Sequence, residues 1–408
     1  MKRGSQIAAA ILAGLMLAAP AAAQDRPPGW QPPPPILVPN FREQWREVVS
    51  ELATYVKQRN PNAVVLMRGG AELLVKGERE VQWDDVQDPD GRNYERRLPL
   101  GTVFREFIKP LDGLVLDGLY CGPYRFEKPL GETIRERKAL DAKLAEDRAH
   151  GIQRPPVATP MGPFSIDPAK ELARAAEIRR KAEVAERQRR EVYAIEAMRG
   201  FGRRILSVER CATPAEAEAA RARAARDQIL AFAQADDSRL DRRPPGHAPL
   251  ENSDPVRSLT AARNWLVLLD AEHYGTRAEW VSALDGTNYD ILVIDVTHRG
   301  DDPLTKADVA TLHYKALGAP RLVLADIPIG RAFDTRWYWR KGWTAGNPAF
   351  LYAPDRTQPG AYIADLANPK WKELLGKYVA GAMDLGFDGV VFDDLDTYLW
   401  FENLMPLE

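Results

Sequence analysis

The chain has 408 residues, with 56 Lys and Arg against 58 Asp and Glu and a formal net charge of −2 at pH 7. Basic and acidic residues alternate without a sustained basic patch, which argues against a nucleic-acid-binding protein. The length allows one large α/β domain or two ordinary ones, each with a sizeable core.

The first 23 residues have the features of a secretory signal peptide. A basic start precedes an apolar run from Ile7 to Ala19, and small residues lead to an expected cleavage site after Ala23. The run is shorter than the roughly 20 residues that cross a bilayer. We therefore expect a periplasmic or secreted protein with no membrane span after cleavage. Residues 24–40 are dense in proline and favour an extended arm.

Short runs rich in Val, Ile and Leu alternate with helical patterns along the rest of the chain. This alternation is typical of a parallel sheet covered on both faces, and eight runs predict a (β/α)8 barrel, a TIM barrel of the α/β class. The runs are AVVLMR from Ala63, LDGLVLD from Leu111, RILSVE from Arg204, WLVLLD from Trp265, ILVID from Ile291, RLVLADI from Arg321, AYIAD from Ala361 and GVVFD from Gly389. A ninth run, QILAFAQ from Gln228, means that at least one of the nine is an edge strand, an insertion or a helix.

Residues 41–61 and 368–386 carry apolar residues at three- and four-residue spacing, which predicts two covering helices. Residues 168–200 are also helical in pattern but highly charged, which predicts a protruding, largely solvated helix. A coiled-coil partner surface is the alternative, although its core positions lack Leu and Ile. Residues 236–255 break both periodicities and are expected to form a linker.

The stretch GFDGVVFDDLD runs from an apolar strand into three carboxylates, Asp393, Asp394 and Asp396, twelve residues before Glu408. Acids at strand ends are how a barrel commonly presents catalytic groups. Because a barrel needs further strand-helix units to close and none follow here, the remaining units are expected elsewhere in the chain.

Four motifs between Trp265 and Tyr398 carry a family resemblance: NWLVLL, YDILVIDVTHRG, RLVLADIPIGRAFDTRWYWRKGW and GFDGVVFDDLDTY. They resemble the first, second, third and fifth strands of the endo-α-1,4-polygalactosaminidase family of glycoside hydrolases. That family is related to secreted barrel proteins once labelled cysteinyl-tRNA-synthetase-like. In it the later strands follow the last of these motifs.

In this chain the later units precede that motif. Phe41 to Tyr124 looks like the family's sixth and seventh units, and the stretch that begins RRILSVERC looks like its final one. The chain therefore resembles a circular permutant: residues 41–235 supply strands 6–8 with a charged helical insertion at about 150–200, a linker spans 236–258, and residues 259–408 supply strands 1–5. Two unrelated half-barrels are the alternative, but they would leave open sheet edges.

Composition leaves open whether Cys121 and Cys211 form a disulfide or remain buried thiols. The resemblance places them just past the seventh and eighth strands, on the same rim of neighbouring strands. It therefore implies a disulfide between them.

Glycosidic cleavage uses two carboxyl groups placed on opposite sides of the sugar, one protonated and one ionised. The family's fifth-strand acid matches Asp393, with Asp396 close by. Its seventh-strand Glu matches Asp117, whose shorter side chain alters the reach of the carboxyl. The third strand departs further, because the family's two acids there are replaced by Arg331 and Phe333. Arg331 cannot act as an acid, although it could bind an anionic or acetylated sugar substituent.

Several other residues are candidates for substrate binding. Asp295 ends the second strand and could hydrogen-bond a sugar hydroxyl or amine, whereas Asp394 is expected to point away from the pocket because strand side chains alternate. Asp326 interrupts an apolar strand and is either a buried structural residue or a ligand. The aromatic residues that could stack on sugar rings are Trp337, Trp339 and Tyr398, with packing in the helix layer as the alternative.

The histidines have no zinc-ligand spacing, and no phosphate loop or serine elbow is present, so no metal or cofactor is expected. The leading interpretation is a secreted or periplasmic glycoside hydrolase of an amino-sugar, galactosamine-type polysaccharide, with Asp117 and Asp393 as its carboxylates. A catalytically degenerate polysaccharide-binding barrel, which the Arg331 and Phe333 replacements favour, and an envelope scaffold are the alternatives.

Overall fold

A computed structural model describes residues 30–407 except 94, 96, 151–167 and 236–238. The expected signal peptide and the first part of the proline-rich arm lie outside these residues. Within them, no helix combines the length and apolar character that a membrane span requires.

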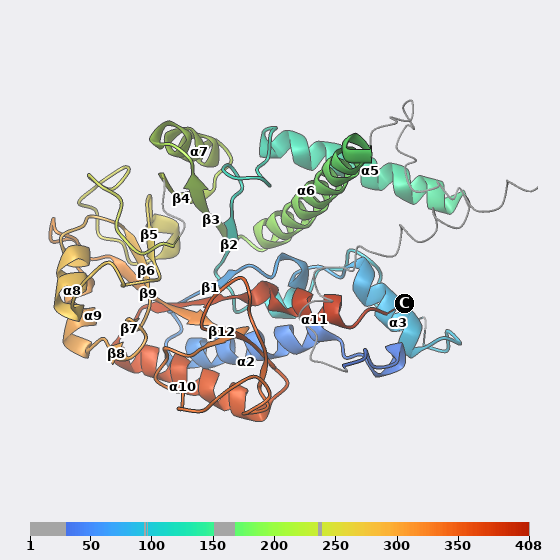
Figure 1. The fold of residues 1–408 in the computed structure, drawn as a ribbon. Coiled ribbons are helices and arrows are strands. Elements are labelled where there is room, and N and C mark those ends of the chain that lie inside the picture. Colours follow the sequence, from blue (N-terminus) through green and yellow to red (C-terminus); the bar gives the residue numbers. More distant parts are fainter. Residues whose placement is uncertain (1–29, 94, 96, 151–167, 236–238, 408) are drawn as a thin grey trace, which may run out of the picture.

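The core of the molecule is an eight-stranded sheet in which every pair of neighbouring strands is parallel (Figure 1). Its strands are rich in branched apolar residues and are buried, as both faces of the sheet are covered. The fold is therefore mixed α/β with a nearly closed, TIM-like barrel. In spatial order the strands are β4 (Leu230–Ala235), β3 (Arg204–Cys211), β2 (Gly113–Asp117), β1 (Val64–Arg68), β13 (Gly389–Asp393), β9 (Leu322–Pro328), β6 (Ile291–Ile294) and β5 (Leu266–Leu268).

The first and last strands of the chain lie side by side. Val64 of β1 is in register with Gly389 of β13, and the two strands run parallel over four residue pairs. Strands from both halves of the chain therefore build one sheet, which excludes two separate half-barrels.

The division of strands differs from the sequence expectation, because each half of the chain supplies four. The ninth candidate run is the barrel strand β4. AYIAD is instead β12 (Ala361–Ala364), which pairs antiparallel with β10 (Arg331–Phe333) and β11 (Leu351–Pro354) in a separate small sheet. The motif at Gly389 is consequently the fourth barrel strand from β5, directly beside β9. A second small ribbon joins β7 (Thr297–His298) and β8 (Asp302–Pro303).

The barrel sheet has its two edges at β4 and β5. Phe232 and Trp265 pack edge to face across this gap, with ring centroids 6.4 Å apart. The N–H of Leu269 donates to the carbonyl of Leu240 over 2.9 Å, which ties the segment after β4 to the end of β5. Side chains and a loop thus close the barrel where ladder hydrogen bonds do not.

Helices cover the outside of the sheet (Figure 1). The two covering helices expected from periodicity are confirmed as α2 (Phe41–Arg59) and α10 (Pro369–Leu385), which begin at the capping residues Asn40 and Asn368. The remaining α-helices are α3 (Glu78–Gln87), α4 (Arg105–Ile108), α5 (Leu130–Ala149), α6 (Pro168–Gly200), α7 (Pro214–Arg226), α8 (Arg277–Asp285), α9 (Lys306–Leu312) and α11 (Tyr398–Leu404). Single 3-10 turns are η3 (Pro35–Leu37), η4 (Ala71–Leu73), η6 (Leu259–Ala261) and η7 (Leu395–Thr397).

The charged helix α6 extends away from the barrel beside α5 (Figure 1). The expectation of a solvated helix holds for its N-terminal part, whose described side chains are exposed. It is wrong for the last turns, because Val192, Ile195 and Met198 are buried against η4 and the strands β2 and β3.

The described part of the proline-rich arm, residues 30–40, is docked rather than free. The carbonyls of Ile36 and Val38 accept hydrogen bonds from Gln87 and Trp83 of α3, and Val38 is buried. Residues 239–258 of the expected linker contain turns and bends but no helix or strand.

Candidate active-site cleft

The carboxyl ends of the barrel strands open into a cleft of about 1320 Å³. Charged side chains dominate its lining. The acids are Asp117, Asp270, Glu272, Asp295, Asp326, Asp393, Asp394 and Asp396, and the arginines are Arg68, Arg187, Arg210, Arg239, Arg299, Arg331 and Arg336. Strand ends gather these residues, since parallel strands all finish at the same rim.

Arg68, the last residue of β1, joins the two acids that the resemblance selects. Its Nε and Nη2 donate to the two carboxylate oxygens of Asp117 at 2.9 and 2.8 Å, and its Nη1 donates to Asp393 Oδ2 at 2.9 Å. The three residues end the adjacent strands β2, β1 and β13. The structure therefore brings Asp117 and Asp393 together on either side of one guanidinium.

The pairing fixes the charge of Asp117. Burial acts to raise the pKa of this carboxyl, but the charge and hydrogen bonds of Arg68 outweigh it, with help from Arg210 and Arg187, and hold the pKa below its usual 3.8. Asp117 is consequently ionised at neutral pH and holds no proton to donate.

Asp326 lies on the neighbouring strand β9, in register with Val391 of β13. Its side chain lines the cleft although the residue is only 6% exposed. Its Oδ1 is buried and has no hydrogen-bond partner among the described residues. Burial, followed by the negative charge of Asp393, raises the pKa of Asp326 well above its usual 3.8.

Asp394 faces the cleft, contrary to the expectation from strand alternation. Its backbone turns into the left-handed region, with φ of +60°, so the alternation of the strand ends before it. It forms an ion pair with Arg331, which also donates to Asp355 at 2.6 Å. Burial and the adjacent Asp393 raise the pKa of Asp394 to about 6. Arg331 reaches the cleft, but two carboxylates already neutralise it.

Asp295 and Asp396 also line the cleft, and both are engaged by protein groups. Asp295 accepts hydrogen bonds from the N–H and hydroxyl of Thr297, each at 2.9 Å, and forms an ion pair with Arg336. Asp396 accepts from the backbone N–H of Gly70 at 2.7 Å. Both carboxylates therefore brace the loops around the cleft.

The three aromatic residues expected to bind sugar are not among the residues that line the cleft. Trp337 is 45% exposed and packs edge to face on Tyr378, and Trp339 packs on Trp343. Tyr398 is fully buried. Sequence spacing could not show which way the rings of Trp337 and Trp339 point. Packing against neighbouring aromatic residues orients them away from the cleft.

A disulfide joins Cys121 and Cys211 on the rim of the cleft, as the resemblance implied. The same loop is held by Glu209, which accepts hydrogen bonds from the backbone N–H groups of Leu119, Tyr120 and Cys121 at 3.0 to 3.1 Å. Burial raises the pKa of Glu209 to about 7. These bonds fix the segment that follows Asp117.

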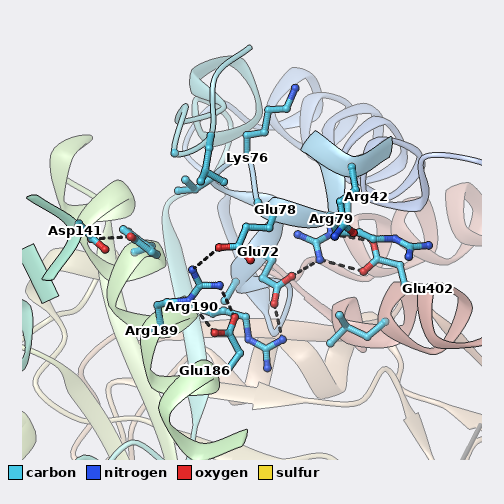
Figure 2. Close-up of a pocket in the computed structure, with 18 of the residues that line it drawn as sticks. Arg42, Glu72, Lys76, Glu78, Arg79, Asp141, Glu186, Arg189, Arg190 and Glu402 are labelled. Atoms are coloured by element: carbon cyan, nitrogen blue, oxygen red, sulfur yellow. Dashed lines mark hydrogen bonds and ion pairs between the residues drawn. The ribbon is translucent and has the colours of Figure 1, made fainter. Parts of the chain in front are cut away.

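A second pocket, of about 520 Å³, lies between α6, η4, α3 and α11 (Figure 2). Ion pairs fill its walls. Glu72 binds both Arg42 and Arg190, and Arg189 binds Glu78 and Glu186. We call this the α6 pocket.

Sequence reasoning missed Arg68 and left the role of Asp326 open. The sequence does mark both residues as unusual, because Arg68 ends the apolar run VVLMR and Asp326 interrupts an apolar strand. Among the described residues, no group of three or more His, Cys, Asp or Glu side chains is placed to hold a metal ion.

Comparison with known proteins gives relatives but no family: no family model matches the chain. An uncharacterized protein of Deinococcus radiodurans is 28% identical over 160 residues, which cover 39% of this chain and 49% of the relative. Uncharacterized proteins of Thermotoga maritima and Methanocaldococcus jannaschii are 25% and 26% identical, over 35% and 38% of this chain and 43% and 44% of their own lengths. The chain thus aligns with less than half the length of each of these relatives.

Proposed function

We propose that the chain is a glycoside hydrolase that cleaves an amino-sugar polysaccharide of the galactosamine type. The observation that carries the proposal is the pair Asp117 and Asp393, held by Arg68 at the carboxyl ends of adjacent barrel strands in one cleft. Glycosidic cleavage uses a pair of carboxyl groups beside the anomeric carbon, and this site brings two together.

The lining of the cleft supports a sugar that carries amines. Its volume accommodates several sugar units, and eight acids face it. Protonated amines of galactosamine would pair with such carboxylates, while hydroxyl groups would bind the arginines and backbone groups. Sugar recognition by stacking has less support, since Phe333 is the one aromatic side chain among the described lining residues.

In this proposal Asp393 is the carboxylate that acts at the anomeric carbon, and Asp117 stabilises the positive charge that develops there. Arg331 and Phe333, which replace the two third-strand acids of the resembled family, would alter the substituents that the cleft accepts. We assign neither retention nor inversion of configuration.

We further propose that the barrel is a circular permutant of that family, with α6 as an insertion and residues 236–258 as the joint. The adjacency of β1 and β13 supports this history, because the permuted ends would lie at that seam. A signal peptide at residues 1–23 and the Cys121–Cys211 disulfide fit a secreted or periplasmic protein.

The test is release of reducing ends from partly and fully acetylated galactosamine and glucosamine polysaccharides by the mature protein. Wild type should release them, and Asp393→Asn should not. Asp384→Asn, which alters an exposed carboxylate paired with Arg59 on the helix layer, should match wild type. No release from any polymer would contradict the proposal.

A non-catalytic polysaccharide-binding protein is the second candidate. The observation that favours it is that Arg68 binds both expected catalytic carboxylates and lowers the pKa of Asp117, which therefore holds no proton to donate. Binding of polysaccharide without cleavage, by wild type and Asp393→Asn alike, would establish this function instead.

A further inference from the structure

We propose that Asp326 is the proton donor of the cleft, the general acid that protonates the leaving sugar oxygen. The inference rests on the proposed glycosidase function and supplies what Asp117 lacks. The family resemblance does not point to this residue, which belongs to the third-strand motif whose usual acids are absent.

The other acids on the same strand ends are each bound by a donor. Arg68 binds Asp117 and Asp393, and Arg331 binds Asp394. Asp295 is bound by Thr297 and Arg336, and Asp396 by Gly70. Each of these contacts stabilises the ionised form of a carboxyl group.

Asp326 differs in its hydrogen bonding. Its Oδ1 is buried without a hydrogen-bond partner among the described residues, although the side chain lines the cleft. An ionised carboxylate with a bare buried oxygen is costly, whereas a protonated carboxyl can be held there more easily. The direction of its pKa, raised by burial, agrees with this argument.

Charged and titratable groups face Asp326 from several elements. The carboxylates disfavour its ionisation, and the guanidinium favours it. They are Asp393 at the end of β13, Asp394 directly after it, Asp295 after β6, Arg68 at the end of β1, and the hydroxyl of Tyr378 of α10.

In the proposed reaction, Asp326 transfers its proton as the glycosidic bond breaks. The bond from the anomeric carbon to the leaving oxygen breaks with its electron pair on the oxygen, which takes the proton of Asp326. The new bond to carbon comes from Asp393 or from a water molecule that gives its proton to Asp393. Asp326 is left ionised. It recovers its proton from the water molecule that hydrolyses the bond to Asp393, where that bond forms, or otherwise from solvent.

Substrates with different leaving groups test the role. On polysaccharide, Asp326→Asn should lose about 10²- to 10⁴-fold in kcat, the usual contribution of a general acid. On a dinitrophenyl glycoside of a galactosamine oligosaccharide, whose leaving group needs no proton, it should lose less than about tenfold. Asp393→Asn should lose activity on both substrates.

The outcomes separate this inference from the proposed function. If wild type cleaves and Asp326→Asn cleaves polysaccharide equally well, or loses equally on both substrates, Asp326 is not the donor and the glycosidase assignment stands. If wild type cleaves neither substrate, the proposed function fails and this inference falls with it.

Thermal unfolding across pH gives a readout that does not depend on activity and also shows that the variant folds. The folded chain holds a proton on Asp326 that the unfolded chain loses above about pH 4, so wild-type stability should fall as pH rises above that value. The Tm of Asp326→Asn should exceed that of wild type at pH 7, and the difference should vanish near pH 4. A difference that does not change with pH would overturn the inference.

Discussion

The cleft and the α6 pocket are both lined by charged residues, but they are organised differently. In the α6 pocket the carboxylates and arginines are matched, and Glu72 is held between Arg42 and Arg190 (Figure 2). In the cleft Arg68 likewise binds two carboxylates, but Asp326 keeps a bare buried oxygen.

This difference distinguishes charged residues that stabilise the fold from acidic residues that are available for catalysis. Ion pairs attach α6 to the barrel, and Glu72, Glu78 and Glu186 each have an arginine partner. An acid that burial keeps protonated beside ionised carboxylates is the arrangement that acid–base chemistry uses.

The largest expected effect is on turnover. Asp393→Asn should lower kcat on polysaccharide by at least about 10³-fold, because it removes the carboxylate assigned to the anomeric carbon. The matched change in the α6 pocket, Glu186→Gln, alters an acid paired with Arg189 and should leave kcat unchanged. Equal losses in the two variants would show that the contrast between the regions is mistaken.

The disulfide on the rim of the cleft should contribute more to stability than any of the ion pairs around it. Cys121 and Cys211 are 90 residues apart, and closing a loop of that size stabilises a fold by about 4.6 kcal/mol in the chain-entropy model. Replacing both with Ser should lower the free energy of unfolding in guanidinium by about that amount. A loss below about 1 kcal/mol would argue against an intact bridge.

Removal of Arg68 should destabilise the fold and do so in a pH-dependent way. Arg68→Gln leaves two carboxylates without their cation, at a cost of about 3 kcal/mol at pH 7. Because the pKa of Asp117 is lowered in the fold, this stabilisation is present above about pH 4 and is lost as the pH falls through the folded-state value. Urea unfolding at pH 7 and pH 3 measures both.

Arg190→Gln in the α6 pocket is the control, and its loss should be smaller, since Glu72 keeps its contact with Arg42. A larger loss than that of Arg68→Gln would reverse the contrast between the two regions.

A smaller effect tests the seam between β1 and β13. A Cβ at Gly389 would lie 1.9 Å from the carbonyl oxygen of Val64, so Gly389→Ala should force the strands apart and cost about 1–3 kcal/mol. Gly381→Ala, at an open position of α10, should instead add about 0.5–1 kcal/mol. Differential scanning calorimetry of both variants would reveal whether this seam is packed as described.

Much of the barrel, including its eight strands, follows from local patterns, but the choice of those eight among nine candidate runs does not. The apolar runs at Val64, Gly113, Ile291, Leu322 and Gly389 become parallel barrel strands as predicted. The run at Ala361 has the same composition but pairs antiparallel outside the barrel. Periodicity cannot distinguish the two, because the partner strand decides the outcome.

Prediction of the candidate site from the sequence is limited in the same way. Asp117 and Asp393 were predicted from the family resemblance, which matches them to acids at two strand ends. Arg68 was not, because its role depends on the pairing of β1 with both β2 and β13. The register pairs Met67 with Leu114 and Val64 with Gly389, which lie 47 and 325 residues apart in the chain. The orientation of Trp337 and Trp339 likewise depends on aromatic packing that spacing does not reveal.

The most direct test of the account is the structure of Asp393→Asn bound to a galactosamine oligosaccharide. The account predicts that the sugar lies across the strand ends, with a glycosidic oxygen within about 3 Å of the Asp326 carboxyl and the anomeric carbon facing residue 393. An oligosaccharide bound in the α6 pocket, or on the exposed face of Trp337 with the cleft empty, would contradict it.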